Sequence, residues 1–396
     1  MKRIVATSVA IMLAIAMAGP NCWATIYQFD GSVDNAFLTP NNWSVTPGMT
    51  PDPGVPTVGD RAIINNDFVV THATAVTTTV GSLIVGADWP VTGELGRDGT
   101  LNMTAGKIIV TGGGDNFQIA RARGAVFGDA DGDGLINMTN AQLEIGGSDP
   151  IVGTRDHGVL DVGLNAKVYN TTGQDNYWRL GNYGPSVDAG LEGNGLLNVH
   201  NNGTFNAHVI FIGDNDSTGE LRVSDTGSVV LTGNLVPRPS GFQAGGSATV
   251  RMTGSSATLQ AYNLESESLA GEIPTKYRFD ADALGVSVIK LTDAINITNN
   301  NLEVNLGAFV LPTYGSLLLF DGDHTGIGGT PVGSRVFGTF ANFSVNGITN
   351  PSNYVVVYDQ PNGNILLQSV PEPSTILLLG FGMVMTIFVA KRRETR

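Results

Sequence analysis

A short glycine-led motif repeats through the middle of the chain, and this repetition restricts the fold more than any other feature of the sequence. Each copy starts with a small residue, continues apolar-polar-apolar, passes a polar turn and ends in a second apolar segment. The copies begin at Gly99, Gly134, Gly158, Gly195 and Gly219, with a weaker one at Ala248. Self-similarity at a recurring interval is typical of proteins built from stacked structural units.

A second element precedes several copies: a short apolar run that ends in glycine, found at 83–86, 151–153, 178–181 and 211–213. The repeating unit is therefore a short strand ending in glycine, a loop, and two further short strands. Two of the intervals between copies are 24 residues, and the others are longer. We interpret 24 residues as the basic coil and the excess as loop insertions.

Strands this short cannot bury an apolar face alone, but stacked coil on coil they bury one continuous core. Apolar residues alternate with polar ones in each copy, as half-buried strands require. The alternating apolar positions are Leu101, Met103, Ile136, Met138, Leu160, Val162, Leu197, Val199, Leu221 and Val223. The sequence thus predicts an all-β fold, a parallel β-helix (β-solenoid). A β-sandwich is the alternative, because short strands with glycine turns also suit it.

The pattern divides the chain into five parts. Residues 99–261 hold the repeats, and the irregular segment 25–98 is expected to form an N-terminal β cap region. Alternation continues through a C-terminal β region, 262–369, and the sequence leaves open whether this region continues the solenoid. The remaining parts are the two ends, 1–24 and 370–396.

The N-terminal part has the layout of a secretory signal. Lys2 and Arg3 precede an uncharged apolar run at 4–18, and small residues at Cys22 and Ala24 follow. A basic start, a short apolar helix and a small-residue cleavage site are what signal peptidase recognises. We expect cleavage after Ala24, with an uncleaved membrane anchor as the alternative.

The C-terminal part combines three features in order. They are Pro371, Glu372, Pro373 and Ser374; an uncharged segment from Ile376 to Ala390; and the basic residues Lys391, Arg392 and Arg393. As a helix the apolar segment would span roughly 22 Å, short of the ~30 Å hydrocarbon core. It predicts a marginal transmembrane helix, with the basic residues as its cytoplasmic stop.

This tail closely resembles the PEP-CTERM sorting signal, although the resemblance covers only the end of the chain. Membership would imply a Gram-negative producer and an exosortase-type enzyme that recognises 371–374 and removes the tail. The resemblance therefore implies an inner-membrane-anchored precursor and a mature form at the cell surface or outside the cell. An ordinary single-pass tail anchor is the alternative.

An acidic segment is the clearest candidate for a metal site. Asp129, Asp131 and Asp133 alternate as in the first half of an EF-hand-like calcium loop, where carboxylates converge on one hard cation. However, the twelfth position is Asn140, which offers no bidentate carboxylate. The segment also occupies the same place in the repeat as 213–219, which contains Asp214 and Asp216. A plain acidic turn between coils is therefore the alternative to calcium.

Composition excludes several functions. The net charge of −14 disfavours nucleic acid, whose phosphates would be repelled. The single cysteine lies in the signal region, so no cysteine nucleophile or disulfide framework is expected in the mature chain.

Little in the sequence points to catalysis or to a sugar site. An enzyme that acts on polysaccharide would need clustered carboxylates beside arginine, and the candidates are Asp156, Asp161, Asp188, Glu192, Arg155 and Arg179. Candidate sugar-stacking aromatics are Tyr177, Trp178 and Tyr183, although aromatics in solenoids more often cover the core. We expect a non-enzymatic structural or adhesive protein of the envelope or exopolysaccharide. The alternative is a β-helical protein that binds or degrades polysaccharide.

Overall fold

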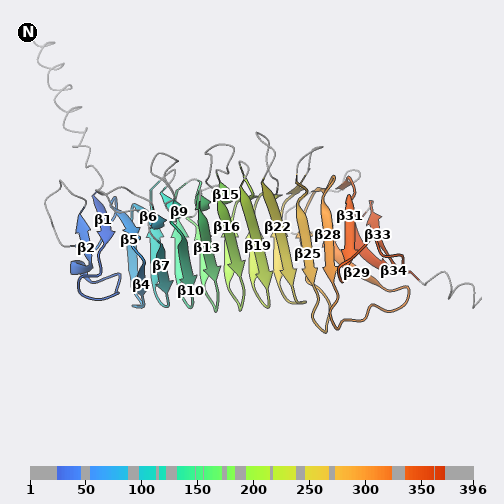
Figure 1. Cartoon of the computed structure of the whole chain (residues 1–396), viewed down its shortest axis with the longest axis horizontal. Coiled ribbons are helices and arrows are strands. Elements are labelled where there is room, and N and C mark those ends of the chain that lie inside the picture. The colour runs from blue at the N-terminus through green and yellow to red at the C-terminus, as the bar shows by residue number, and fades with distance from the viewer. Residues whose placement is uncertain are drawn as a thin grey trace, which may run out of the picture.

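The strands lie side by side along one elongated stack in the computed structural model of the chain (Figure 1). The structure describes residues 25–45, 54–87, 98–112, 116–121, 132–147, 149–154, 156–171, 176–182, 193–214, 217–237, 246–266, 273–322, 335–360 and 362–370. The predicted signal helix and the predicted transmembrane helix lie outside these residues. In the described part of the chain, no helix is long and apolar enough to span a bilayer.

Three long sheets, here named A, B and C, contain all the named strands. In spatial order, sheet A consists of β2 (Trp43–Val45), β1 (Ile26–Phe29), β3 (Arg61–Ile64), β6 (Ser82–Ala87), β9 (Phe117–Arg121), β12 (Ile151–Thr154), β15 (Tyr177–Asn182), β18 (Val209–Ile212), β21 (Leu235–Pro237), β24 (Leu264–Glu265), β27 (Ile295–Asn296) and β30 (Val336–Phe337). A 3₁₀ turn, η1 (Pro40–Asn42), precedes β2.

Sheet B follows the same direction along the stack. It consists of β4 (Phe68–His72), β7 (Gly99–Met103), β10 (Gly134–Met138), β13 (His157–Val162), β16 (Asn194–Val199), β19 (Thr218–Ser224), β22 (Ser247–Thr253), β25 (Lys276–Asp280), β28 (Asn301–Asn305), β31 (Asn342–Val345) and β32 (Ile348–Thr349).

Sheet C completes the set. It consists of β5 (Thr77–Val80), β8 (Lys107–Val110), β11 (Gln142–Ile145), β14 (Lys167–Asn170), β17 (Thr204–Ala207), β20 (Ser228–Leu231), β23 (Thr258–Ala261), β26 (Ile289–Leu291), β29 (Ser316–Asp321), β34 (Asn364–Ser369) and β33 (Tyr354–Asp359).

From β3 to β31 successive strands enter sheets A, B and C in turn, so each strand from β3 to β28 pairs in parallel with the strand three places further along the chain. The register follows the sequence repeat: Gly99 of β7 pairs with Gly134 of β10, and Met103 pairs with Met138. This order is compatible with the parallel β-helix that the repeats predict. Consecutive repeat strands do not form hairpins in the described residues, in contrast to the β-sandwich alternative.

The core runs the length of the stack. All ten alternating apolar positions predicted from the repeats are at most 1% exposed, so the predicted inward face is confirmed. Trp178 lies in this core and makes edge-on contacts with Phe117 and Phe205. The interior is thus an apolar column lined by matched positions of successive coils.

The repeat glycines lie where sheets A and B meet, too close to the neighbouring backbone for a side chain. A Cβ on Gly134 would lie 2.2 Å from the carbonyl oxygen of Val85. The glycine that ends the preceding sheet A strand adopts a positive φ, for example +74° at Gly181. Glycine is favoured at such a conformation because it has no Cβ.

The turns between sheets B and C are short and polar in the middle of the stack. Their tight corners use asparagine with positive φ, such as Asn140, Asn165 and Asn201. Asparagine tolerates this left-handed conformation better than most side chains. These corners become longer and more apolar only in the last coils.

Antiparallel strands close both ends of the stack. β2 pairs with β1 at the N-terminal end, where the indole nitrogen of Trp43 donates a hydrogen bond of 2.8 Å to the carbonyl of Phe37. At the other end, β34 pairs antiparallel with β29 and β33, and β32 pairs antiparallel with β31. Such caps cover edges that could otherwise recruit strands from another chain. Parallel pairing runs without a break across residues 98 and 261, since β4 pairs with β7 and β23 with β26.

Candidate functional site

The outer face of sheet B carries one residue from each coil in a single straight column, which we call the outer column. The register places each member beside the next, and all ten of them are polar or charged. The outer column consists of Thr71, Asn102, Asn137, Asp161, Asn198, Arg222, Arg251, Arg278, Glu303 and Ser344. Strands in a sheet lie about 4.8 Å apart, so the column presents polar groups at that interval.

Hydrogen bonds join the first part of the outer column. The amide of Asn137 donates to the side-chain oxygen of Asn102 at 2.9 Å, and the amide of Asn198 donates to Asp161 at 2.6 Å. His200 also approaches Asp161, with its Nε2 at 3.2 Å from the carboxylate. Cross-strand pairs of this kind stabilise a sheet face and orient its side chains.

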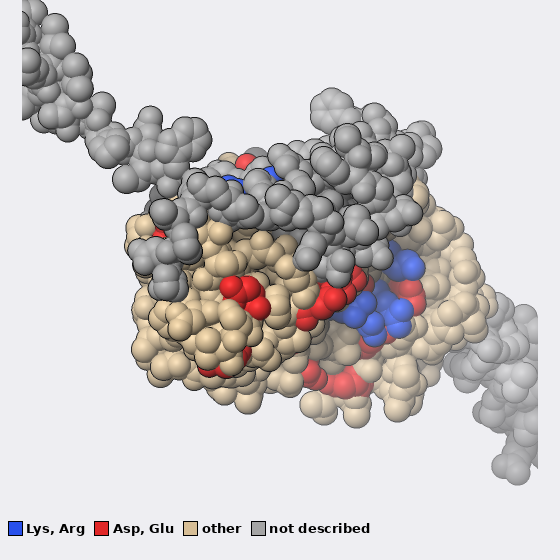
Figure 2. Space-filling model, turned by 60° about the vertical axis from the view of Figure 1, so that its left-hand side comes forward, with Lys and Arg blue, Asp and Glu red and all other residues tan. Residues whose placement is uncertain are grey.

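Three arginines follow one another in the second part of the column, and acidic residues flank them. We call this the arginine cluster: Arg222, Arg251 and Arg278 with Glu220, Asp280 and Glu303. Nε of Arg222 lies 2.6 Å from Glu220, and Nε of Arg251 lies 2.6 Å from Asp280. Figure 2 shows basic and acidic side chains gathered in one such cluster on the surface.

Arg278 links the two acidic neighbours of the cluster. Its guanidinium lies 3.0 Å from Asp280 and 3.6 Å from Glu303, and Lys276 approaches Glu303 at 3.9 Å. Each carboxylate of the cluster therefore has a basic partner. The pairs of Arg251, Arg278 and Lys276 with Asp280 and Glu303 form one connected network, which fixes their charged groups more firmly than isolated surface pairs would. Arg222 and Glu220 form a separate pair beside this network.

The electrostatics of the cluster favour charged forms. Burial opposes the charge of Asp280, but hydrogen bonds from Asn305, Arg251 and Arg278 hold the pKa of this carboxyl below its usual value. The pKa of Arg222 is raised by its hydrogen bonds to Glu220. A carboxylate held ionised is a hydrogen-bond acceptor rather than a general acid, and hydroxyl-rich ligands offer donors for it.

The predicted calcium residues lie only partly in the described structure. Asp129 and Asp131 are outside it, and Asp133 immediately precedes β10. The backbone N–H of Asp133 donates to Asp98 at 3.2 Å, and that of Gly132 donates to Asp156. Burial raises the pKa of Asp156, and the nearby Asp133 adds to the effect. A cation would relieve that repulsion, but no three histidine or acidic residues in the described ranges gather as a metal site.

The second acidic turn is held by an ion pair. Asp214 is buried and bonds to the guanidinium of Arg179, which also stacks over Phe211. Asp216 lies outside the described residues. Arg179 lies on sheet A, and its ion-pair partner Asp214 belongs to the next coil. Asp161 lies on sheet B. These two members of the predicted enzymatic cluster are on different sheets, and Arg155, Asp188 and Glu192 lie outside the described residues.

The three aromatic residues proposed to stack on sugars do not form one exposed platform in the described residues. Trp178 is fully buried, which supports its interpretation as a core residue. Tyr177 is half exposed and contacts His208 and Phe211, while Tyr183 lies outside the described residues.

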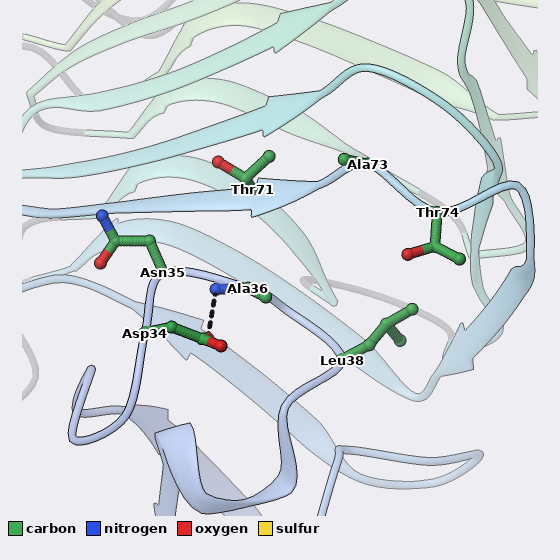
Figure 3. Close-up of a pocket in the computed structure, with 7 residues that line it drawn as sticks. All are labelled: Asp34, Asn35, Ala36, Leu38, Thr71, Ala73 and Thr74. Carbon is green, nitrogen blue, oxygen red and sulfur yellow. Dashed lines mark hydrogen bonds between the residues drawn. The ribbon is translucent and has the colours of Figure 1, made fainter.

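A concave site of about 300 Å³ lies at the N-terminal end of the stack. Figure 3 shows the loop with Asp34, Ala36 and Leu38 on one side and Thr71 and Thr74 on the other. Hydrogen bonds from the backbone of Ala36 and from Asn42 lower the pKa of Asp34. The carboxylate thus shapes its own loop, and we assign this site a structural role.

Sequence reasoning missed the arginine cluster. The signal was present, because Arg222, Arg251 and Arg278 each stand between two apolar residues at the same point of successive repeats. Aligning the repeats by their polar positions, and not only by their apolar ones, would have placed them in one column.

The sorting residues 371–374, the apolar segment 376–390 and the basic residues 391–393 lie outside the described structure. Residues 369–393 match the PEP-CTERM protein-sorting motif. No curated protein and no solved structure matches the chain. The motif identifies a protein that is exported as a membrane-anchored precursor and processed by an exosortase-type enzyme.

Proposed function

We propose that the chain is a non-enzymatic structural or adhesive protein, a single parallel β-helix associated with the envelope or the exopolysaccharide outside the cell. The outer column carries this proposal, because it presents fixed amide, carboxylate and guanidinium groups at regular spacing along the stack. Hydroxyl-rich polymers offer hydrogen-bond donors and acceptors over their whole length. A long, rigid polar face suits repeated weak contacts with such a polymer.

The pairing within the outer column supports a scaffold. Arg222, Arg251 and Arg278 are held by Glu220, Asp280 and Glu303, so the face is ordered before any ligand arrives. A preorganised surface loses less entropy on binding than a flexible one. Adhesion would then need no conformational change in the stack.

The ends of the chain supply the route. Signal peptidase would remove 1–24 during export, and the apolar segment 376–390 would hold the precursor in the inner membrane until the exosortase-type enzyme cleaves near 371–374. The membrane would thus be a partner of the precursor only, and exopolysaccharide the partner of the mature protein.

A co-sedimentation assay with exopolysaccharide isolated from the producing host tests the adhesive role. The protein is expected to sediment with the polymer, and Arg222→Gln/Arg251→Gln/Arg278→Gln is expected to weaken binding at least tenfold. Lys107→Gln/Lys167→Gln/Lys290→Gln is the matched control, because it also removes three cationic side chains, but from sheet C. Equal binding by both variants would refute the role of sheet B in binding. If the unaltered protein did not bind the polymer, the adhesive role itself would be refuted.

The arginine cluster also favours a second candidate, a protein that degrades polysaccharide, because three carboxylates lie beside arginines on one face. The same polymer serves as the substrate. Appearance of new chain ends with the unaltered protein, and their loss with Asp280→Asn, would support the enzyme. The scaffold proposal expects no new chain ends from either.

A further inference from the structure

Exposed apolar side chains gather at the C-terminal end of the stack, at the corner between sheets B and C. Leu284 follows β25, Val310 and Tyr314 precede β29, and Ile348 lies beyond the turn after β31. They are 83%, 81%, 63% and 63% exposed, respectively. We call these four residues the end corner.

The end corner differs from the same corner elsewhere. In the middle of the stack these turns are short and built from residues such as Asn140, Asn201 and Asp225. Val76, in the turn after β4, and Leu164, in the turn after β13, are single exposed apolar residues at this corner. Isolated apolar residues on a surface need no explanation, whereas a cluster marks a contact site.

Hydrogen bonds between the turns place them side by side. The N–H of Ala281 donates to the carbonyl of Asn305 at 2.8 Å, and the N–H of Leu306 donates to the side chain of Asn346 at 2.7 Å. The turns therefore follow one another at successive coils. Asp282, the carboxylate beside Leu284, accepts hydrogen bonds from Ser255 and from the Leu284 backbone.

The chain leaves the stack at this same corner. The hydroxyl of Ser369, the last residue of β34, donates to the carbonyl of Pro312 at 2.6 Å, and its N–H donates to Gly315 at 3.0 Å. These hydrogen bonds hold the turn that contains Val310 and Tyr314 against the end of β34, where the sorting tail begins.

Only residues 371–375 separate Val370 from the apolar segment at 376. Fully extended, that length of chain reaches roughly 20 Å. While the tail is attached, the end corner is therefore held close to the membrane surface. Aliphatic and tyrosine side chains suit that interface.

We propose that the end corner contacts the lipid surface in the precursor, and so orients the stack and the cleavage motif on the membrane. This inference rests on the proposed membrane insertion of the tail. Its occupant is a bilayer, and after cleavage the corner would be released together with the protein.

Lipid quenching of a fluorescent probe tests the proposal in the full-length chain. Cys22→Ser removes the only cysteine, and Val310→Cys then carries an environment-sensitive label in phosphatidylcholine vesicles with quencher lipids. Leu164→Cys is the matched control, since Leu164 is an exposed aliphatic residue at the equivalent corner in mid-stack. The Val310 probe is expected to be quenched at least threefold more than the Leu164 probe.

The alternative results are distinct. Equal quenching at the two positions would overturn the proposal. A shielded Val310 probe without lipid quenching would mean that a second copy covers the corner, which also overturns it. A probe at Gly382→Cys reports on the tail: if it is not quenched, membrane insertion itself fails, whereas quenching there but not at Val310 refutes only the contact of the end corner.

Discussion

Gly219 of β19 lies directly against Gly213, the residue that follows β18 of sheet A: a Cβ at Gly219 would be 2.4 Å from the backbone nitrogen of Gly213. The same Cβ would be 2.2 Å from the carbonyl oxygen of Leu180 in the preceding coil. Both obstacles are backbone atoms and cannot rotate away. This relationship explains why the two glycine motifs of the sequence occur together. Gly213 adopts the positive φ of the corner, and Gly219 has no Cβ that would collide with the backbone of that corner.

Gly219→Ala is expected to destabilise the protein by about 1–3 kcal/mol, because the added methyl group forces backbone atoms apart. Chemical denaturation measures the change. Ala248→Gly is the control: the same column already carries alanine there, and the reverse substitution is expected to cost only about 0.5–1 kcal/mol. An unchanged midpoint for Gly219→Ala would contradict the packing of this corner.

Trp178→Ala is expected to cost about 3–5 kcal/mol, because it removes a fully buried aromatic side chain from between Phe117 and Phe205. Tyr177→Ala, the neighbouring substitution on the opposite face of the strand, is expected to cost far less. Thermal unfolding compares the two. If Tyr177 proved the more costly, Trp178 would not be the core residue described above.

Asp280→Asn is expected to lower stability by about 2 kcal/mol at pH 7, because it replaces charge-assisted hydrogen bonds from Arg251 and Arg278. The folded-state pKa of Asp280 is lowered, so its contribution is complete above the unfolded-state pKa of roughly 3.9 and disappears as the pH falls through the folded-state value. Unfolding measured from pH 2 to 7 should show the two proteins converging in acid. Asp225→Asn, at an exposed turn, is the control and should cost little stability at pH 7. A gap for Asp280→Asn that stays constant from pH 2 to 7 would refute the assignment.

The hypothesis of a calcium site at Asp129, Asp131 and Asp133 predicts that calcium stabilises the protein. A bound ion present at a hundredfold its Kd adds about 2.7 kcal/mol to stability. EDTA should therefore lower the melting temperature, and Asp129→Asn/Asp131→Asn should abolish that response while Asp225→Asn keeps it. A melting temperature that EDTA leaves unchanged would assign 129–133 to a plain acidic turn.

The inward face of the stack could be predicted from sequence because apolar alternation at residues such as Leu101 and Ile136 has one simple cause, burial in a common core. The strand order followed from the spacing of the repeats. The alternation within 262–369 left the continuation of parallel pairing beyond residue 261 open. The sheet B strands β25 and β28 lack the leading glycine of the repeat, and the sheet A strands β24 and β27 have only two residues.

The candidate site was harder to predict for a related reason. Polar residues on an outer face are not constrained by packing, so the outer column changes from Asn to Arg to Glu without losing the fold. Contacts across coils, such as that between Asp133 and Asp156, depend on register and lie far apart in sequence. Only the structure brings them together.

Disulfide formation in the double variant Asn102→Cys/Asn137→Cys tests the central claim that strands three places apart lie side by side. Asn102 and Asn137 are paired across β7 and β10, at a spacing that a disulfide can bridge. In a Cys22→Ser background, mild oxidation followed by intact mass should show near-complete loss of two hydrogens, with little for Asn102→Cys/Ile109→Cys, whose residues lie in different sheets. The opposite outcome, an Asn102–Ile109 bond and none between 102 and 137, would mean that consecutive strands form hairpins and would contradict the stack.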